Sequence, residues 1–194
     1  RRSLYGSMSA ARAALLTFLL PLFLSCSLDY EQATVAESIS GQIPETILFE
    51  FIHTVVSEGR VWVILEAQRA ESYGERNEIL LQGVFFREYD GEGNLITEAR
   101  ADRAVFSTDS ENATVSGSIQ IYSHEQEASL QAGRLSWVRE GRRLVADDGQ
   151  TVRLQKDDGS YVEGEGFAAD FRRKRLEFSS RVRGSYVREE EEEE

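Results

Sequence analysis

The chain has 194 residues, of which 41% are hydrophobic, and its formal net charge is −12. This length is sufficient for one domain with a sizeable core. The acidic balance argues against a nucleic-acid partner, which would require clustered Lys and Arg. Two prolines, fifteen glycines and little helical periodicity indicate the all-β class.

Residues 1–25 have the organisation of a secretory signal peptide. Arg1, Arg2 and Arg12 precede an apolar run over residues 13–24. As a helix this run would rise about 18 Å, which is less than a hydrocarbon core of about 30 Å. A positive n-region, a short apolar region and a small residue before the break are typical of a signal peptide. Met8 would start a more ordinary signal peptide, which would make residues 1–7 an artefact of start-site assignment.

Cys26, the only cysteine of the chain, follows this segment directly. A single cysteine cannot form an intrachain disulfide, so it does not crosslink the fold. The residues Phe23-Leu24-Ser25-Cys26 resemble a bacterial lipobox, in which the cysteine is lipidated and becomes the first mature residue. We therefore predict lipidation at Cys26. The alternatives are cleavage without lipidation and retention of the segment as an uncleaved anchor. Lipidation and retention would each anchor the following domain outside the cytoplasm, beside a membrane.

Residues 26–44 are polar and small, which is typical of a tether, and residues 45–187 form the predicted β-domain. Segments rich in β-branched and aromatic residues alternate with turn residues such as those at 57–59, 90–94 and 147–149. Turns that recur about every 8–12 residues favour a sandwich, a barrel or a jelly roll. The predicted strands are 47–56, 60–67, 79–89, 113–122, 130–138, 144–146 and 151–155.

A pair of small or apolar residues three positions apart recurs at intervals of 34, 31 and 34 residues. An aromatic residue, a polar turn and a β-rich strand follow each pair. A period of this size with two strands per unit indicates stacked antiparallel units, although any β-protein gives a loose period of this size. The pairs are Ala67/Ala70, Ala101/Ala104, Ala132/Leu135 and Gly166/Ala169, and the partner strands centre on Val84, Ile119, Val152 and Val182.

The stretch from Tyr161 to Tyr186 is predicted to be a hairpin. Its second half alternates apolar and charged residues, which predicts one long strand with one dry and one wet face. Gly164 and Gly166 lie two residues apart, and glycines inside a strand mark a bend or a close approach by another segment. The charged turn 172–174 is expected to join the two halves.

No catalytic or metal-binding constellation is recognisable. His53 and His124 are the only histidines, and neither has a second ligand at metal-binding spacing. The acidic pairs at 147–148 and 157–158 precede glycine and are explained by turn chemistry. We therefore expect no enzymatic activity and no cofactor; the alternative is an enzyme whose active-site carboxylates lie among these turn residues. Residues 188–194 include six consecutive glutamates and are interpreted as a disordered acidic tail, the alternative being a functional one.

The chain resembles the LptC family, the periplasmic component of the lipopolysaccharide-export ABC transporter. The resemblance covers about residues 45–187, and the order of its motifs carries it. Many LptC proteins keep a transmembrane helix, whereas this chain has a lipobox-like segment. The matching motifs are Gly83-Val84-Phe85-Phe86-x-x-Tyr89-Asp90-x-x-Gly93, Ala101-x-x-Ala104, Gly164-x-Gly166-x-x-Ala169 and Leu176-x-Phe178-x-x-x-Val182-Arg183-Gly184-x-Tyr186.

This resemblance implies an open antiparallel β-jelly roll, anchored at the inner membrane, whose apolar interior holds the acyl chains of lipopolysaccharide or a related glycolipid. It also implies that the N-terminal edge faces the periplasmic domains of the ABC transporter and that the C-terminal edge faces an LptA-like bridge protein. ATP hydrolysis elsewhere would supply the energy. The partner edge is predicted at Gly164, Gly166, Arg181, Val182, Arg183, Gly184 and Tyr186.

The dry faces of the strands supply the candidates for the lipid groove. The alternative is that these residues form the packed core of a closed β-sandwich, in a structural or adhesive lipoprotein without a groove. Phe85 is the alternative inward residue of its strand. The groove candidates are Val84, Phe86, Ile119, Ile121, Val152, Leu154, Leu176, Phe178 and Val182.

Overall fold

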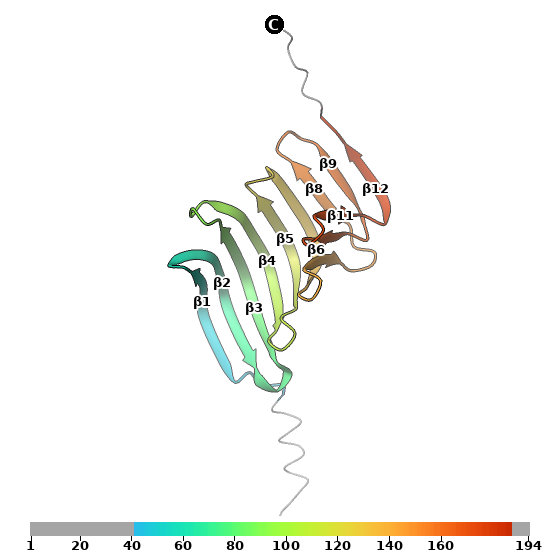
Figure 1. Cartoon of the computed structure of the whole chain (residues 1–194). Coiled ribbons are helices and arrows are strands. Elements are labelled where there is room, and N and C mark those ends of the chain that lie inside the picture. The colour runs from blue at the N-terminus through green and yellow to red at the C-terminus, as the bar shows by residue number, and fades with distance from the viewer. Residues whose placement is uncertain (1–40, 188–194) are drawn as a thin grey trace, which may run out of the picture. The chain divides into compact units, whose positions relative to one another are not determined.

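The computed structural model describes residues 41–187, which form an all-β domain (Figure 1). The predictions for the signal segment 1–25, for Cys26, for most of the tether and for the tail 188–194 lie outside the described residues. The strands are β1 (Thr46–Ser57), β2 (Arg60–Tyr73), β3 (Glu78–Tyr89), β4 (Leu95–Ser107), β5 (Ala113–Ser123), β6 (Ala128–Val138), β7 (Arg143–Ala146), β8 (Val152–Lys156), β9 (Tyr161–Glu165), β10 (Ala168–Asp170), β11 (Arg175–Glu177) and β12 (Ser180–Ser185), with a short 3-10 turn η2 (Gly74–Arg76) between β2 and β3.

All twelve strands belong to one antiparallel sheet that divides at β6. From β1 to β7 each strand pairs with the next along the chain. The second half of β6, Leu135–Val138, pairs with β7, whereas its first half, Ala128–Gln131, pairs with β8. One branch continues as β7-β10-β11 and the other as β8-β9-β12 (Figure 1). The prediction of an open antiparallel jelly roll is confirmed, and β4 fills the gap between the strands predicted at 79–89 and 113–122.

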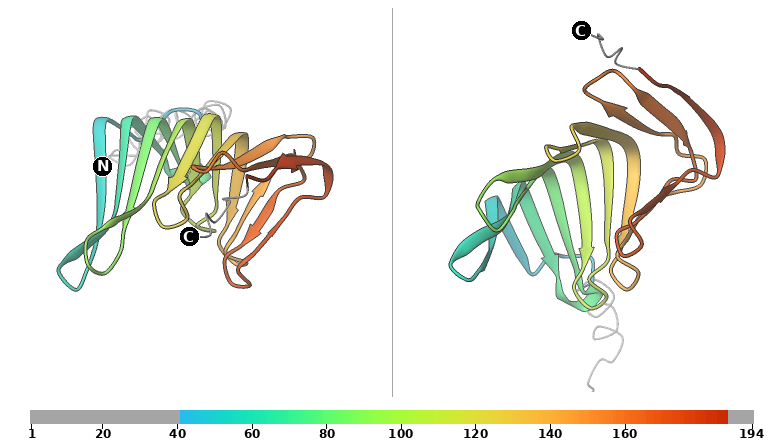
Figure 2. Two further views of the ribbon diagram at one scale, coloured as in Figure 1. Left: turned by 90° about the horizontal axis from the view of Figure 1, so that it is seen from above. Right: turned by 45° about the horizontal axis from the view of Figure 1, so that its top comes forward.

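A crease crosses the N-terminal strands and bends them, and Figure 2 shows their curvature. Glu50 in β1, Gly83 in β3 and Gly117 in β5 have φ angles of 53°, 61° and 95°. The pairing register places Glu50 and Gly83 opposite Gln68 of β2. Beside Gly117, Asp102 of β4 accepts a hydrogen bond from Ser118 N–H at 2.9 Å. Residues outside the β region, placed at the same level of alternate strands, bend the whole sheet along one line.

The crease explains the recurring residue pairs. In a strictly alternating strand, positions i and i+3 point to opposite faces. Ala67 and Ala70, however, are both buried (3% and 4% exposed), as are Ala101 and Ala104. The bend between the two members of each pair changes the phase of alternation, so both face the interior. The pairs on β2, β4 and β6 are structurally equivalent, whereas Gly166/Ala169 spans the link between β9 and β10.

The core consists of two neighbouring clusters on the inner face. The N-terminal cluster contains mainly small side chains, and the C-terminal cluster contains larger ones. Val115 of β5 packs against both clusters. The N-terminal cluster is Ala67, Ala70, Leu81, Val84 and Ala104; the C-terminal cluster is Ala101, Ile119, Leu130, Leu135, Val152 and Phe167.

The prediction of one long final strand is wrong. β11 pairs with β10, and β12 pairs with β9, so the segment belongs to both branches of the sheet. Between them Phe178 turns toward the core, with its ring centroid 5.4 Å from that of Phe167. Arg181 has a φ of 51° at a register shift, which interrupts the expected alternation. The turn 172–174 does join β10 and β11 as an antiparallel hairpin.

We expect Gly117→Ala to destabilise the domain. Its φ of 95° is unfavourable for a residue with a Cβ, and the added carbon would overlap the Asp102 side chain. Backbone strain of this kind costs about 1–3 kcal/mol. Gly93→Ala is the matched control, because Gly93 has a φ of 93° but a Cβ added there would meet no atom within 4 Å. Chemical denaturation should therefore show a larger loss for Gly117→Ala; equal losses would contradict the close packing at the crease.

Candidate functional site: an apolar interior between two open edges

The pairing register aligns apolar residues in rows across the inner face. One row is continuous from β2 to β9 through paired positions of successive strands. A second row joins Phe51, Ala67, Val84 and Ala101 from β1 to β4. An apolar surface that crosses so many strands is suited to long hydrocarbon chains. The first row is Leu65, Phe86, Ala99, Ile121, Leu130, Leu154 and Val162.

The interior is open near β1 and closed near β8. On β1, the inward-facing Leu48 is 46% exposed and Phe51 is half-buried. Phe86 on β3 is also half-buried. Ile119 on β5 is only 3% exposed, and Val152 on β8 is completely buried. The inner face of the described domain is therefore well exposed at β1, while the small residues of β2 to β4 and the larger ones around β8 are buried.

The predicted groove residues fall into three groups. Val84, Phe86, Ile119, Ile121, Val152 and Leu154 lie on the two inner rows or pack against the core between them. Phe178 packs against the C-terminal cluster. Leu176 and Val182 are 48% and 55% exposed and lie outside the packed interior. Lipid binding by any of these residues remains a prediction.

Phe167 is a central residue of the interior that the sequence reasoning missed. It lies between β9 and β10, is 2% exposed and packs against Phe178. Its carbonyl oxygen accepts a hydrogen bond from Ala146 N–H at 2.9 Å, which connects the link to β7. The one available indication was an aromatic side chain directly between the small residues Gly166 and Ala168. Phe167 closes the interior at the point where the two branches separate.

β1 is an edge strand with an apolar surface. Within residues 41–187 it pairs only with β2. Phe49 and Ile52 are 70% and 66% exposed, and Val56 is 56% exposed. An edge strand has unpaired backbone N–H and C=O groups, and a long apolar edge without cationic side chains is suited to strand addition by a partner.

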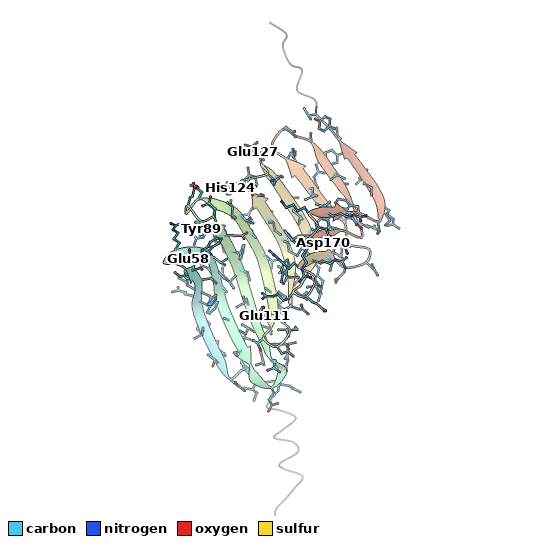
Figure 3. All side chains as sticks on the ribbon, in the orientation of Figure 1. Glu58, Tyr89, Glu111, His124, Glu127 and Asp170 are labelled. Atoms are coloured by element: carbon cyan, nitrogen blue, oxygen red, sulfur yellow. The ribbon has the colours of Figure 1, made fainter. Side chains whose placement is uncertain are left out.

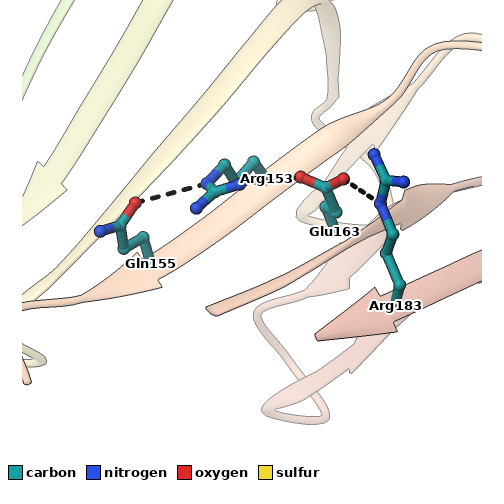
Figure 4. Close-up of polar contacts among 4 residues, drawn as sticks. All are labelled: Arg153, Gln155, Glu163 and Arg183. Atoms are coloured by element: carbon teal, nitrogen blue, oxygen red, sulfur yellow. Dashed lines mark hydrogen bonds and ion pairs between the residues drawn. The ribbon is translucent and has the colours of Figure 1, made fainter. Parts of the chain in front are cut away.

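β12 is the edge strand of the C-terminal branch, and ion pairs fasten it to β9. Glu163 of β9 pairs with Arg183 of β12 and, at 3.0 Å, with Arg153 of β8 (Figure 4). Glu165 pairs with Arg181 of β12 at 2.8 Å. Arg181 and Arg183, which were predicted to lie at the partner edge, therefore form ion pairs with β9, while most of each side chain remains exposed.

Two predicted edge glycines allow β9 and β12 to lie close together. A Cβ on Gly184 would lie 2.5 Å from the carbonyl oxygen of Tyr161. A Cβ on Gly164 would meet the Phe178 ring and the backbone of β12 at 3.1–3.3 Å. Gly166 has a φ of 66° and supports the bend after β9. Tyr186, at 80% exposure, lies beyond the end of β12.

The ion pairs of Glu163 predict a pH-dependent stability. Its hydrogen bond from Arg183, and then that from Arg153, hold the pKa of its carboxyl below the ordinary value of 4.5. A lowered pKa in the folded state stabilises the fold above the unfolded-state pKa, and this contribution is lost as the pH falls through the folded-state pKa. We expect Glu163→Gln to reduce the fall in melting temperature between pH 5 and strongly acidic pH. An unchanged acid profile would contradict this assignment.

The remaining polar groups of the described domain act in turns and on strand surfaces. Asp157 accepts a hydrogen bond from Tyr122 at 2.7 Å, and Asp158 accepts one from Ser160 N–H. His53 stacks on Phe51. Among residues 41–187 no group of three His, Cys, Asp or Glu side chains is placed to hold a metal ion. In the same range no helix has the length and apolar character needed to cross a bilayer.

Comparison with protein families gives a match to the family described as "Lipopolysaccharide-assembly, LptC-related", over residues 13–187. The chain belongs to the LptC family. No curated protein matches it. Among solved structures, the periplasmic LptA homologue LptH of the lipopolysaccharide transport device from Pseudomonas aeruginosa aligns with 11% identity and a TM-score of 0.31, covering 77% of this chain and 99% of that one. Membership of the family makes this LptC-related chain a component of lipopolysaccharide transport.

Proposed function

We propose that this LptC-related chain is a membrane-anchored periplasmic transfer component for lipopolysaccharide or a related glycolipid. It receives the lipid from an ABC transporter and passes it to an LptA-like bridge protein, without catalysing a reaction itself. The observation that carries the proposal is the continuous apolar inner face, exposed at the edge strand β1 and continued toward the branch that ends in the edge strand β12. Anchoring at the inner membrane through Cys26 or an uncleaved segment belongs to the same proposal.

The open half of the interior holds the acyl chains. Transfer of hydrocarbon from water is favourable by about 0.8 kcal/mol for each buried CH₂ group, so several acyl chains bind firmly without covalent chemistry. Phe51, Leu65 and Phe86 are half-buried on the inner face and can cover such chains. Their exposure in the described domain leaves apolar area that a lipid would remove from water.

Two of the edge strands, β1 and β12, make the contacts with the partners. β1 joins the periplasmic domains of the transporter by strand addition, and its apolar faces add buried area to the backbone hydrogen bonds. β12 joins the bridge protein in the same way. The proposed direction of transfer is therefore from the transporter at β1 to the bridge protein at β12.

The edge assignment can be tested by photo-crosslinking in intact cells. A photoreactive residue at Ile52 of β1 is expected to label the periplasmic domains of the ABC transporter, and one at Val182 of β12 to label the bridge protein. Both side chains are more than half exposed, so the substitutions leave the core unchanged. Labelling of the bridge protein from Ile52, or of the transporter from Val182, would reverse the proposed direction.

One observation favours the alternative of a structural β-sandwich without a groove. Leu135, Val152 and Phe167 are 1%, 0% and 2% exposed, which is the packing of a closed core. A structural lipoprotein would extend this packing to the β1 side and bind no glycolipid. Lipid labelling at the open half distinguishes the two functions.

A further inference from the structure

A further apolar row crosses the inner face on the branch that ends in β11. Ile79 of β3 pairs with Phe106 of β4, and paired positions of successive strands then lead to β11. Leu144 and Ala169 pack against the C-terminal cluster and Ile79 packs against the N-terminal cluster, so this row faces the interior. The β11 row, as we name it, is Phe106, Ala113, Trp137, Leu144, Ala169 and Leu176.

The β11 row is partly exposed along its whole length. From Phe106 to Ala169 each member is half-buried, and Leu176 at the end of the row is 48% exposed. The neighbouring row nearer the crease is closed, because its members Ala104 and Leu135 are only 7% and 1% exposed. The apolar area that a lipid can still cover on this branch therefore lies in the β11 row.

An aromatic pair adds apolar area beside this row. Phe171, in the turn after β10, packs against Trp137 with ring centroids 5.7 Å apart. Its backbone N–H donates a hydrogen bond of 3.0 Å to the carbonyl oxygen of Arg142, which joins this turn to the one after β6. Phe171 is nevertheless 52% exposed. Because Trp137 belongs to the β11 row, the Phe171 ring extends that row on the inner side of the branch.

The opposite face of this branch is polar. Arg143, Asp170 and Arg175 pair in register across β7, β10 and β11, and Figure 3 labels Asp170 on this branch. Together with Arg173 and Glu177 they line a polar hollow. Strand alternation places these side chains on the face opposite the β11 row. The exposed apolar side chains of the branch are therefore confined to the side that the proposed function assigns to the lipid.

The deeper part of the interior is filled near the C-terminal edge. Phe167 and Phe178 pack with ring centroids 5.4 Å apart where the two branches separate, and the completely buried Val152 belongs to the same cluster. A Cβ on Gly164 would meet the Phe178 ring at 3.1 Å, so little space is left beside it. The β11 row reaches an edge strand without crossing this cluster.

We propose that the acyl chains of the glycolipid pass along the β11 row and leave the domain at β11, where Trp137, Phe171 and Leu176 make the last contacts. This inference rests on the proposed transfer function and adds the place at which the lipid is delivered. Hydrocarbon binds there because it removes the apolar area of these side chains from water. β11 has three residues and β12 has six, so β12 supplies most of the backbone hydrogen bonds to the bridge protein while β11 delivers the lipid.

Photo-crosslinking at β11 tests this route. A photoreactive residue replaces Leu176 of the row or the neighbouring Glu177, which is also exposed but lies on the polar face. The same residue at Phe86 is the reference for lipid bound on the other inner row. The full chain is incubated with purified lipopolysaccharide of the host. We expect labelling of the lipopolysaccharide from positions 86 and 176 and none from position 177.

The outcomes separate this inference from the proposed function. Labelling from position 86 without labelling from position 176 would overturn the route over β11 but leave lipid binding standing. Protein that labels lipopolysaccharide from neither position would overturn both. Equal labelling from positions 176 and 177 would show that lipid contacts both faces of the edge alike, which also contradicts the inference.

Phe171 allows the delivery step to be tested by itself. For Phe171→Asn we expect loaded protein to pass lipopolysaccharide to the bridge protein about fivefold more slowly, because apolar contact area is lost. Phe171→Leu keeps an apolar side chain against Trp137 and is expected to stay within about twofold of the parent rate. A parent rate for the asparagine variant, or equal slowing by both variants, would exclude delivery at this surface. A parent that transfers nothing would overturn the proposed function as well.

Discussion

Phe167→Ala is expected to lower the free energy of unfolding by about 3–5 kcal/mol, which is the usual cost of truncating a buried phenylalanine. Phe167 is 2% exposed and packs against Phe178 with ring centroids 5.4 Å apart. It also belongs to the cluster that joins β5, β6 and β8. Loss of the ring would leave a cavity where the two branches of the sheet separate, so both branches would lose support. Urea denaturation followed by tryptophan fluorescence and circular dichroism measures the change.

Phe49→Ala is the control for this substitution. Phe49 lies on edge strand β1 and is 70% exposed, so truncation leaves no cavity. Its expected cost is below about 1 kcal/mol, as for most surface substitutions. A loss for Phe167→Ala as small as that for Phe49→Ala would show that the C-terminal cluster is not packed as described.

Val152→Asp is expected to destabilise the domain by about 3–5 kcal/mol at neutral pH, which is the typical cost of an uncompensated buried charge. Val152 is fully buried, and Ile119 and Phe167 belong to the same cluster. Burial raises the pKa of the new carboxyl above its unfolded-state value of about 3.9. The difference in stability from the parent should therefore shrink as the pH falls and the carboxyl becomes protonated in the folded state.

Val182→Asp provides the comparison for this second substitution. Val182 is 55% exposed on β12, so a carboxylate there remains in water. Its expected effect on stability is within about 0.5 kcal/mol at every pH. Equal destabilisation by the two substitutions would contradict the described difference between a packed interior and an exposed C-terminal edge.

Much of the sheet could be predicted from the sequence because its strands follow simple patterns. Alternation and turn residues gave most strands to within a few residues, including the one observed at Ala113–Ser123. The residue pairs such as Ala67/Ala70 marked equivalent positions on β2, β4 and β6. The crease that produces these pairs was not predictable. Part of it is formed by Glu50, whose positive φ is uncommon for a residue with a side chain.

The final segment shows why pattern alone was insufficient. Leu176, Phe178 and Val182 are equivalent in the alternation, yet only Phe178 packs in the core. The difference arises because β6 pairs with two strands, which sends β11 and β12 to separate branches. A sequence carries no local indication of such a division.

The sequence predicted which residues of the candidate site point to the inner face of the sheet, but not how deeply each of them is buried. The pairing register places Val84, Phe86 and Ile121 in the inner rows of the sheet, and their role in a lipid groove stays a prediction. Whether an inward residue is packed or open depends on how many other strands cover it. Val152 is therefore closed and Leu48 open, although both are ordinary apolar strand residues.

Photo-crosslinking to the lipid tests the central claim most directly. A photoreactive residue replaces Phe86, which is half-buried on the inner face, or Gln120, which is exposed and accepts a hydrogen bond from Arg100 at 3.0 Å. The full chain is then incubated with the host's own glycolipid. We predict labelling of the glycolipid from position 86 and none from position 120. Folded protein that gives no labelling at position 86, or equal labelling at both positions, would contradict an open lipid-binding interior.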